Sequence, residues 1–323
     1  MIWAWPWTNF LRDLVEVRGS QQQLAQYVAV LTGVRRALDD WIPRQRLDDF
    51  KELMFKLGLK VRVDCVFSAL DRSSQVLGAA VVPTTEAVAL PFQDKMVSQA
   101  GSTVHLVVSS RSDWADEALA AAWYPVAVDN RILRKPLIDN LWLGRAFGYP
   151  DCCSDFFIRH NDWPRLNTLA EATNRSALIR WETNCLPKHT PWMAVFHMPC
   201  EWNCHATREY TEGVLAAVSQ FDKGYATEIK RIMSQPYLVV SELQIYVLEN
   251  AEILDVSRVK YGRASYMGAN IRHDRFSAGL ARGNELEVQD GIIHVWQDGH
   301  YVTAMETRCD LGVVEVPLVL NFE

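Results

Sequence analysis

Apolar residues recur at helical spacing through the first part of the chain. Between residues 21 and 41 one stripe at a 3.6-residue period is formed by Leu24, Tyr27, Val28, Leu31 and Val34. A second helical stretch, residues 46–58, closes at Gly58, which suits a helix C-terminus. The mixed charges of residues 34–49 are typical of a solvated helical face. We therefore expect helices over most of the first sixty residues.

The pattern changes to that of β-strands after residue 58. Residues 59–70 alternate apolar and polar side chains, which predicts a strand with Val61, Val63 and Cys65 on one face. Residues 102–110 are a β-branched run, followed by a helix-like stretch at 113–123 and a short apolar run. This order of strand, helix and strand predicts a small βαβ-like element that ends near Asn130.

Helical patterns return between residues 136 and 234, and strand patterns follow to residue 323. The first of the central helices is expected to end at Gly148. The strand-rich part carries two hairpin turns, Asp290-Gly291 and Asp298-Gly299. We predict a mixed α/β (α+β) fold with N-terminal helices, the βαβ-like element, a central helical cysteine-bearing region and a C-terminal antiparallel β unit. The expected regions are residues 1–135, 136–234 and 235–323.

Composition narrows the possible partners. The chain has 323 residues and a net charge of −6 with interspersed signs, which argues against nucleic-acid or anionic-membrane binding. The apolar start of the chain contains Pro6 and Asp13 and lacks a basic segment, so it is expected to be neither a signal peptide nor a membrane helix. We expect a cytoplasmic protein whose seven cysteines are free, catalytic or metal-bound. The oligomeric state is left open.

The first cysteine motif lies at a predicted helix start. Gly148 ends one helix, Pro150 presets the first turn of the next, and Asp151 adds a favourable charge there. Cys152 and Cys153 then fall in that first turn. Unsatisfied N–H groups and the positive end of the helix dipole lower the pKa of a thiol at such a place.

The second cysteine motif, residues 196–205, predicts the same arrangement. Pro199 is expected to begin a helix with Cys200 in its first turn and Cys204 four residues later on the same face. His197 lies one turn before Cys200, and His205 directly follows Cys204. If the two helix starts face each other, up to four thiolates converge, which suits an iron–sulfur cluster, zinc or copper(I).

The adjacent cysteines Cys152 and Cys153 favour one of these cofactors over the others. Adjacent residues of a helix point about 100° apart, so Cys152 and Cys153 are not expected to bind the same small ion. The leading hypothesis is therefore a [4Fe-4S] cluster on Cys152 and/or Cys153 together with Cys200 and Cys204. Three thiolates leave one iron open to a substrate, and the spare cysteine would be a fourth ligand, a proton donor or a sulfur acceptor.

The two histidines and the remaining cysteines leave alternatives open. His197 and His205 are candidate proton carriers beside the cluster. One alternative is a structural zinc site in a binding or scaffold protein. The other is a metal-free thiol enzyme with Cys153 or Cys200 as nucleophile and either histidine as base. Cys185, between the two motifs, is a possible further ligand.

Arginines suggest the class of substrate. Arg208 follows the second motif on the same expected helix, while Arg263 and Arg272 belong to the most basic stretch of the chain, residues 257–276. Such side chains can bind a carboxylate or a phosphate. The predicted function is therefore an iron–sulfur-dependent enzyme that acts on a small anionic molecule by lyase, dehydratase or sulfur-transfer chemistry.

The cysteine motifs resemble those of a known family. Residues 143–157 read L-G-x-x-x-G-Y-P-x-C-C-x-x-F-F, and residues 197–204 read H-x-P-C-x-x-x-C. This pair is similar to the hallmark of an uncharacterised archaeal and bacterial family, a domain of unknown function marked by G-Y-P-x-C-C. The resemblance covers residues 141–210, about a fifth of the chain. It implies that the four cysteines act together, and it names no reaction.

Overall fold

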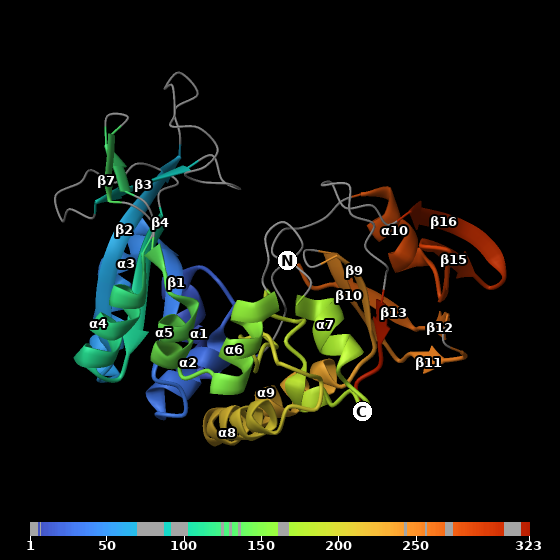
Figure 1. Cartoon of the computed structure of the whole chain (residues 1–323), viewed down its shortest axis with the longest axis horizontal. Helices are drawn as coiled ribbons and strands as arrows, with labels where there is room; N and C mark the ends of the chain where they lie inside the picture. Colours follow the sequence, from blue (N-terminus) through green and yellow to red (C-terminus); the bar gives the residue numbers. More distant parts are fainter. Residues whose placement is uncertain are drawn as a thin grey trace. The chain divides into compact units, whose positions relative to one another are not determined.

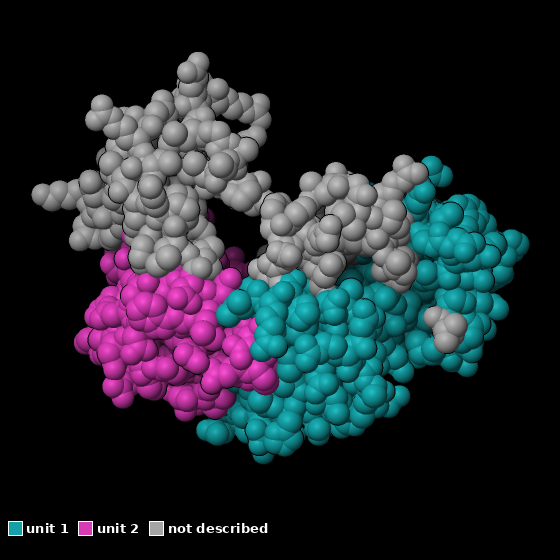
Figure 2. Space-filling view, in the orientation of Figure 1, with its two compact units in different colours: residues 1–3, 156–323 teal, residues 4–155 magenta. Residues whose placement is uncertain are grey.

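The computed structural model has the mixed α+β fold that the sequence predicts (Figure 1). It forms two compact units, one of residues 4–155 and one of residues 1–3 and 156–323, which Figure 2 colours separately. Among the helices that the structure describes, none has the length and apolar composition of a membrane span. The described residues are 6, 8–69, 87–91, 103–123, 126–128, 131–134, 137–160, 168–241, 244–255, 257–268, 274–306 and 318–323.

The unit of residues 4–155 is built on an antiparallel four-stranded sheet of order β1-β4-β2-β3. Its strands are β1 (Ala37–Pro43), β2 (Lys60–Ala69), β3 (Ala87–Pro91) and β4 (Thr103–Ser109). Its helices are α1 (Asn9–Arg18), α2 (Leu24–Leu31), η1 (Arg44–Arg46), α3 (Leu47–Lys56), α4 (Ser112–Ala121) and α5 (Asn140–Phe147). Two short ribbons pair β5 (Ala122–Trp123) with β8 (Leu137–Ile138) and β6 (Val126–Val128) with β7 (Arg131–Arg134). The expected order of strand, helix and strand is present as β4, α4 and β6, but β6 pairs with β7 and not within the sheet of β4, so the predicted βαβ-like element does not form among the described strands. Every described strand pairing is antiparallel.

The prediction of a helical face over residues 34–49 is wrong for its first half. Helix α2 ends at Leu31, and residues 37–43 form strand β1, which pairs with β4 along its whole length. Side chains of a strand alternate between the two faces of the sheet, so Asp39 and Asp40 point to opposite sides. The charge doublet is therefore part of the packed sheet, because pairing with β4 outweighs the local helical pattern.

Asp40 is the centre of a buried ionic group that joins α1 and α2 to the sheet. The Arg18 Nε–H donates to Asp40 Oδ2 at 2.6 Å, and the Tyr27 hydroxyl donates to the same oxygen at 2.6 Å. Burial alone would lower the pKa of Arg18, but Asp40 raises it above its ordinary value. Burial, followed by Asp40, raises the pKa of Tyr27. Arg18 and Asp40 therefore form a buried ion pair whose two partners depend on each other.

The opposite face of the sheet packs on α4 and α5. Buried side chains from β1, β4 and the two helices make up this core: Ala37, Val107, Ala115, Ala118, Ala146 and Phe147. The sheet is therefore covered by helices on both faces. Helix α5 ends at Gly148, whose φ of 75° is the left-handed conformation expected of a glycine at that place.

The unit of residues 156–323 contains helices followed by two antiparallel sheets. Its helices are α7 (Thr168–Asn174), η2 (Trp181–Thr183), α8 (His205–Phe221), α9 (Lys223–Met233) and α10 (Arg275–Arg282). One sheet has the order β13-β10-β9-β17, formed by Arg263–Tyr266, Gln244–Glu249, Tyr237–Ser241 and Leu318–Leu320. The other has the order β11-β12-β14-β15-β16, formed by Glu252–Ile253, Arg258–Lys260, Glu285–Gln289, Ile292–Gln297 and His300–Glu306. Both sheets and α10 share one apolar core.

The two predicted hairpin turns are confirmed in the second sheet. Asp290 and Gly291 connect β14 to β15, and Asp298 and Gly299 connect β15 to β16. All four residues have a positive φ, between 50° and 79°, as a tight two-residue hairpin requires. These Asp-Gly pairs are turns that fix strand register.

We expect Asp40→Asn to lower the free energy of unfolding by about 3–5 kcal/mol, because it leaves the buried Arg18 charge without its carboxylate. Asp116→Asn is the matched control in the same unit, since Asp116 pairs with Arg62 at the surface and should cost less than about 1 kcal/mol. Urea unfolding of both variants measures the difference. Equal effects of the two substitutions would contradict the buried ion pair.

Candidate metal centre

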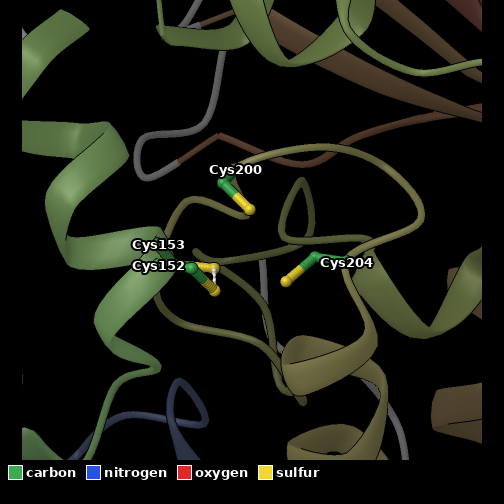
Figure 3. A group of neighbouring side chains, drawn as sticks. All are labelled: Cys152, Cys153, Cys200 and Cys204. Atoms are coloured by element: carbon green, nitrogen blue, oxygen red, sulfur yellow. Dashed lines mark hydrogen bonds between the residues drawn. The ribbon is translucent and has the colours of Figure 1, made fainter.

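Four cysteines from the two sequence motifs form one cluster. The Sγ atoms of Cys152, Cys153, Cys200 and Cys204 all lie within 4.8 Å of one another. The sulfur atoms of Cys152 and Cys153 are 3.9 Å apart. Figure 3 shows the four side chains directed toward a common space. The predicted convergence of the motifs is therefore present in the structure.

The first pair lies where the sequence predicts, at the start of helix α6 (Asp151–His160). Pro150 directly precedes this helix, and its carbonyl accepts from the N–H groups of Cys153 and Ser154 at 3.0 Å each. The side chain of Cys153 is buried, whereas that of Cys152 is exposed. The doublet therefore contributes one buried and one exposed residue to the cluster.

Gly144 in α5 allows α6 to begin where it does. A Cβ atom at this position would lie 2.4 Å from the Ser154 Oγ atom, which is too close for any real contact. The Tyr149 N–H donates to the Gly144 carbonyl at 2.8 Å and helps to close the end of α5. The short connection through Gly148 and Pro150 therefore requires a bare backbone at residue 144.

The second pair does not lie on a helix, so the prediction of a helix from Pro199 is wrong. Residues 197–203 are an irregular segment of bends and turns, and α8 begins at His205 with Cys204 as its N-cap residue. The Cys204 N–H donates to the Glu201 carbonyl at 3.1 Å and closes a turn after Cys200. Two cysteines on such a turn resemble the knuckle that wraps a zinc ion more closely than two residues of a helix face.

The vicinal cysteines also differ from the expectation. Both were predicted to be unable to approach one small ion, yet their sulfur atoms belong to the same group of four. The reason is that Cys152 and Cys153 occupy the first turn of α6, where side chains extend past the end of the helix rather than across a packed face. Rotation about the Cα–Cβ bonds then brings the two sulfur atoms together (Figure 3).

Trp202 anchors the irregular segment between Cys200 and Cys204. Its side chain is fully buried, and its indole N–H donates to Thr173 Oγ1 at 2.9 Å. Its backbone N–H donates to Ser176 Oγ at 2.6 Å, and its carbonyl accepts from the Arg180 N–H and the Thr183 hydroxyl at 2.8 and 2.9 Å. The segment is thus held by specific hydrogen bonds rather than by helical structure.

Neither predicted histidine belongs to the four-cysteine group. His197 is buried, its Nε2 atom is hydrogen-bonded to Thr207 Oγ1 at 2.9 Å, and its ring meets the edge of Tyr210. These contacts join the segment before Cys200 to helix α8. The His205 side chain is 80% exposed and lies 3.4 Å from Glu209. The geometry therefore gives His197 a positioning role and leaves His205 at the surface.

The other predicted residues lie elsewhere or are not described. Arg208 is on α8, and its Nε atom is buried without a hydrogen bond in the described part of the chain. Arg263 is on β13, with its Nε atom 3.8 Å from a Glu249 oxygen. Arg272 lies outside the described residues. Cys185 is buried, and its Sγ atom lies 3.8 Å from the sulfur of Met198 rather than in the four-cysteine group.

The arrangement of the four cysteines can hold a metal ion. Thiolates are soft ligands, and four of them at this separation would repel one another strongly without a cation between them. Cys153 and Cys204 are buried, so an unpaired negative charge on either sulfur would be costly. A bound cation removes both costs, which is the physical basis for regarding the cluster as a metal centre.

We expect Trp202→Ala to lower the free energy of unfolding by about 3–5 kcal/mol, as for other buried aromatic side chains, and to reduce the metal bound per chain. The metal is lost because the turn that carries Cys200 and Cys204 loses its anchor. Trp142→Ala is the control, since Trp142 is 48% exposed. Urea unfolding and elemental analysis test both variants, and unchanged metal content in a destabilised Trp202 variant would contradict the anchoring role.

Comparison with known proteins adds no family to these observations. No protein-family model matches the chain, and no curated protein or solved structure matches it either. The similarity to the family marked by G-Y-P-x-C-C stays a resemblance of residues 141–210.

Proposed function

We propose that this chain is a zinc-binding protein in which Cys152, Cys153, Cys200 and Cys204 hold a single tetrahedral ion. The observation that carries the proposal is the 4.8 Å limit on every sulfur–sulfur separation. Four thiolates bound to one zinc at about 2.3 Å lie about 3.8 Å from one another. In a cubane each thiolate binds a different iron, so its four sulfur ligands are spread over a larger body. The compact group favours the single ion.

The role of such an ion follows from the segments that it joins. A zinc ion with four protein ligands is closed to substrate and contributes directly to folding. Cys200 and Cys204 flank an irregular segment that has no helical hydrogen bonds of its own before residue 205. The ion would hold this segment against the start of α6 and supply order that the backbone alone does not provide.

A second candidate function is favoured by the uneven exposure of the cysteines. Cys152 is exposed and Cys200 is partly exposed, while Cys153 and Cys204 are buried. If Cys152 is not a ligand, three thiolates remain, as in a [4Fe-4S] enzyme with one open iron. Such an enzyme would act on a small anionic substrate by lyase, dehydratase or sulfur-transfer chemistry. The buried Arg208 Nε–H would donate a hydrogen bond to the anion.

A metal-free thiol enzyme receives less support. A base must be within hydrogen-bond reach of the nucleophilic sulfur. His197 instead bonds Thr207, and His205 lies beside Glu209 at the surface. The described contacts of both histidines therefore point away from general-base chemistry on Cys153 or Cys200.

Metal and sulfide analysis of protein purified without oxygen distinguishes the two candidate functions. We expect the Cys200→Ser/Cys204→Ser variant to hold about one zinc ion less per chain than the wild type, with no acid-labile sulfide in either. Cys185→Ser is the matched control because Cys185 is buried outside the cluster, and it should keep the wild-type content. Iron with acid-labile sulfide, lost in the double variant, would reject the zinc proposal and support the second candidate.

The two adjacent cysteines allow a comparison within the cluster. We expect Cys153→Ser to abolish tight metal binding, because its buried sulfur cannot be replaced by solvent. We expect Cys152→Ser to weaken the affinity and retain binding, because water can reach the vacated, exposed position. Competition with a chromophoric chelator measures both affinities. Loss of the metal from the Cys152 variant alone would show that burial does not determine which of the two cysteines contributes more to metal affinity.

A further inference from the structure

A second group of metal-ligating side chains lies in the sheet of residues 4–155. Asp64 and Cys65 come from β2, and His105 comes from β4. One ligand atom of each lies within 4.8 Å of the others. None of the three belongs to the four-cysteine cluster.

A β-bulge brings Asp64 and Cys65 to the same place. Val63 pairs with Leu106 and Cys65 pairs with His105, so Asp64 is an extra residue in the ladder. In a regular strand, neighbouring side chains would point to opposite faces of the sheet. Here the Cys65 Sγ atom lies 3.5 Å from Asp64 Oδ2, and the His105 Nδ1 atom lies 3.0 Å from the same oxygen. Bulges of this kind are common where a functional side chain must be re-aimed.

The donors are well screened from bulk water. The side chains of Asp64 and His105 are 3% and 6% exposed, and Cys65 is fully buried. A carboxylate, a thiolate and an imidazole together suit a borderline divalent ion such as zinc or cobalt. Three protein donors also leave one tetrahedral position for water or a substrate, as in catalytic rather than structural zinc sites.

The surroundings of His105 match those of a metal-binding imidazole. Its Nδ1 atom faces Asp64, while Asp39 Oδ2 on β1 lies 3.7 Å from its other nitrogen, Nε2. A carboxylate behind the second nitrogen orients the ring and makes the first nitrogen a better ligand. Trp41 packs against the imidazole with ring centroids 5.0 Å apart and is 37% exposed. The indole is therefore the most exposed side chain around His105, and Asp39 is 18% exposed.

We propose that Asp64, Cys65 and His105 bind one divalent transition-metal ion of the zinc type, with Asp39 as the orienting carboxylate of His105. A buried Asp–His ion pair would by itself explain two of these side chains. It does not explain the bulge that places the Cys65 sulfur beside the same carboxylate oxygen. The proposed site is independent of the function proposed for the four-cysteine cluster.

Cobalt(II) titration of the full-length Cys200→Ser/Cys204→Ser variant tests this proposal, because that variant lacks two ligands of the other cluster. We expect about one equivalent of cobalt to bind with a thiolate-to-cobalt charge-transfer band. Adding Cys65→Ser should remove the band and weaken binding more than about tenfold, and adding His105→Gln should weaken binding similarly. Adding Cys185→Ser, a buried cysteine outside both groups, should leave the band unchanged.

Absence of cobalt binding in the folded double variant, or a band that survives Cys65→Ser, overturns the proposal. Circular dichroism establishes that each variant is folded. If the double variant does not fold, the single Cys65→Ser variant of the wild type is titrated instead. It should bind about one equivalent less cobalt than the wild type, and equal binding would be decisive against the site. Loss of zinc in the double variant alone concerns only the four-cysteine cluster, so the two proposals fail separately.

Discussion

The burial of Trp202 is the contact on which the candidate metal centre depends. The segment from Cys200 to Cys204 has no helical ladder, and a buried backbone without such a ladder needs other partners for its N–H and C=O groups. The backbone of Trp202 finds these partners in Ser176, Arg180 and Thr183. Its indole N–H donates to Thr173, and its ring meets Phe322 at a right angle near the end of the described chain. These contacts hold the irregular segment of residues 200–204 in one backbone conformation.

The same principle holds for other irregular parts of the region. The Asn184 amide donates to the Met233 carbonyl at 2.7 Å, and its own oxygen accepts from the Leu186 N–H at 3.0 Å. The Thr211 hydroxyl donates to the Glu182 carbonyl at 2.6 Å. The side chains of Asn184 and Thr211 thus satisfy backbone carbonyls of α9 and η2. Hydrogen bonds of buried polar groups, together with the buried Trp202 side chain, set the position of the loop that carries two of the four cysteines.

The sequence predicted those features that depend on local chemistry. Gly148 and the Asp-Gly pairs impose a backbone conformation on their own residues, and the structure has those conformations. Helix α6 begins directly after Pro150, as the sequence predicts. The helix prediction for residues 37–43 is wrong because these residues pair with β4, a strand that lies sixty or more residues later in the sequence. The helix prediction from Pro199 is wrong for a similar reason, because the hydrogen-bond partners of Trp202, Thr173 and Ser176, are distant in sequence. The bulge at Asp64 left no signal in the sequence, because register is set by pairing and not by composition.

Gly144 links the packing of α5 against α6 to the positions of the sulfur atoms of Cys152 and Cys153. A glycine inside a helix gives up about 1 kcal/mol of stability relative to alanine. Here it allows the backbone of α5 to lie against Ser154, the residue next to Cys153 in α6. A methyl group at residue 144 would have to displace the start of α6, and Cys152 and Cys153 would move with that helix turn. The positions of the cluster's sulfur atoms are therefore sensitive to residue 144, which carries no donor atom of its own.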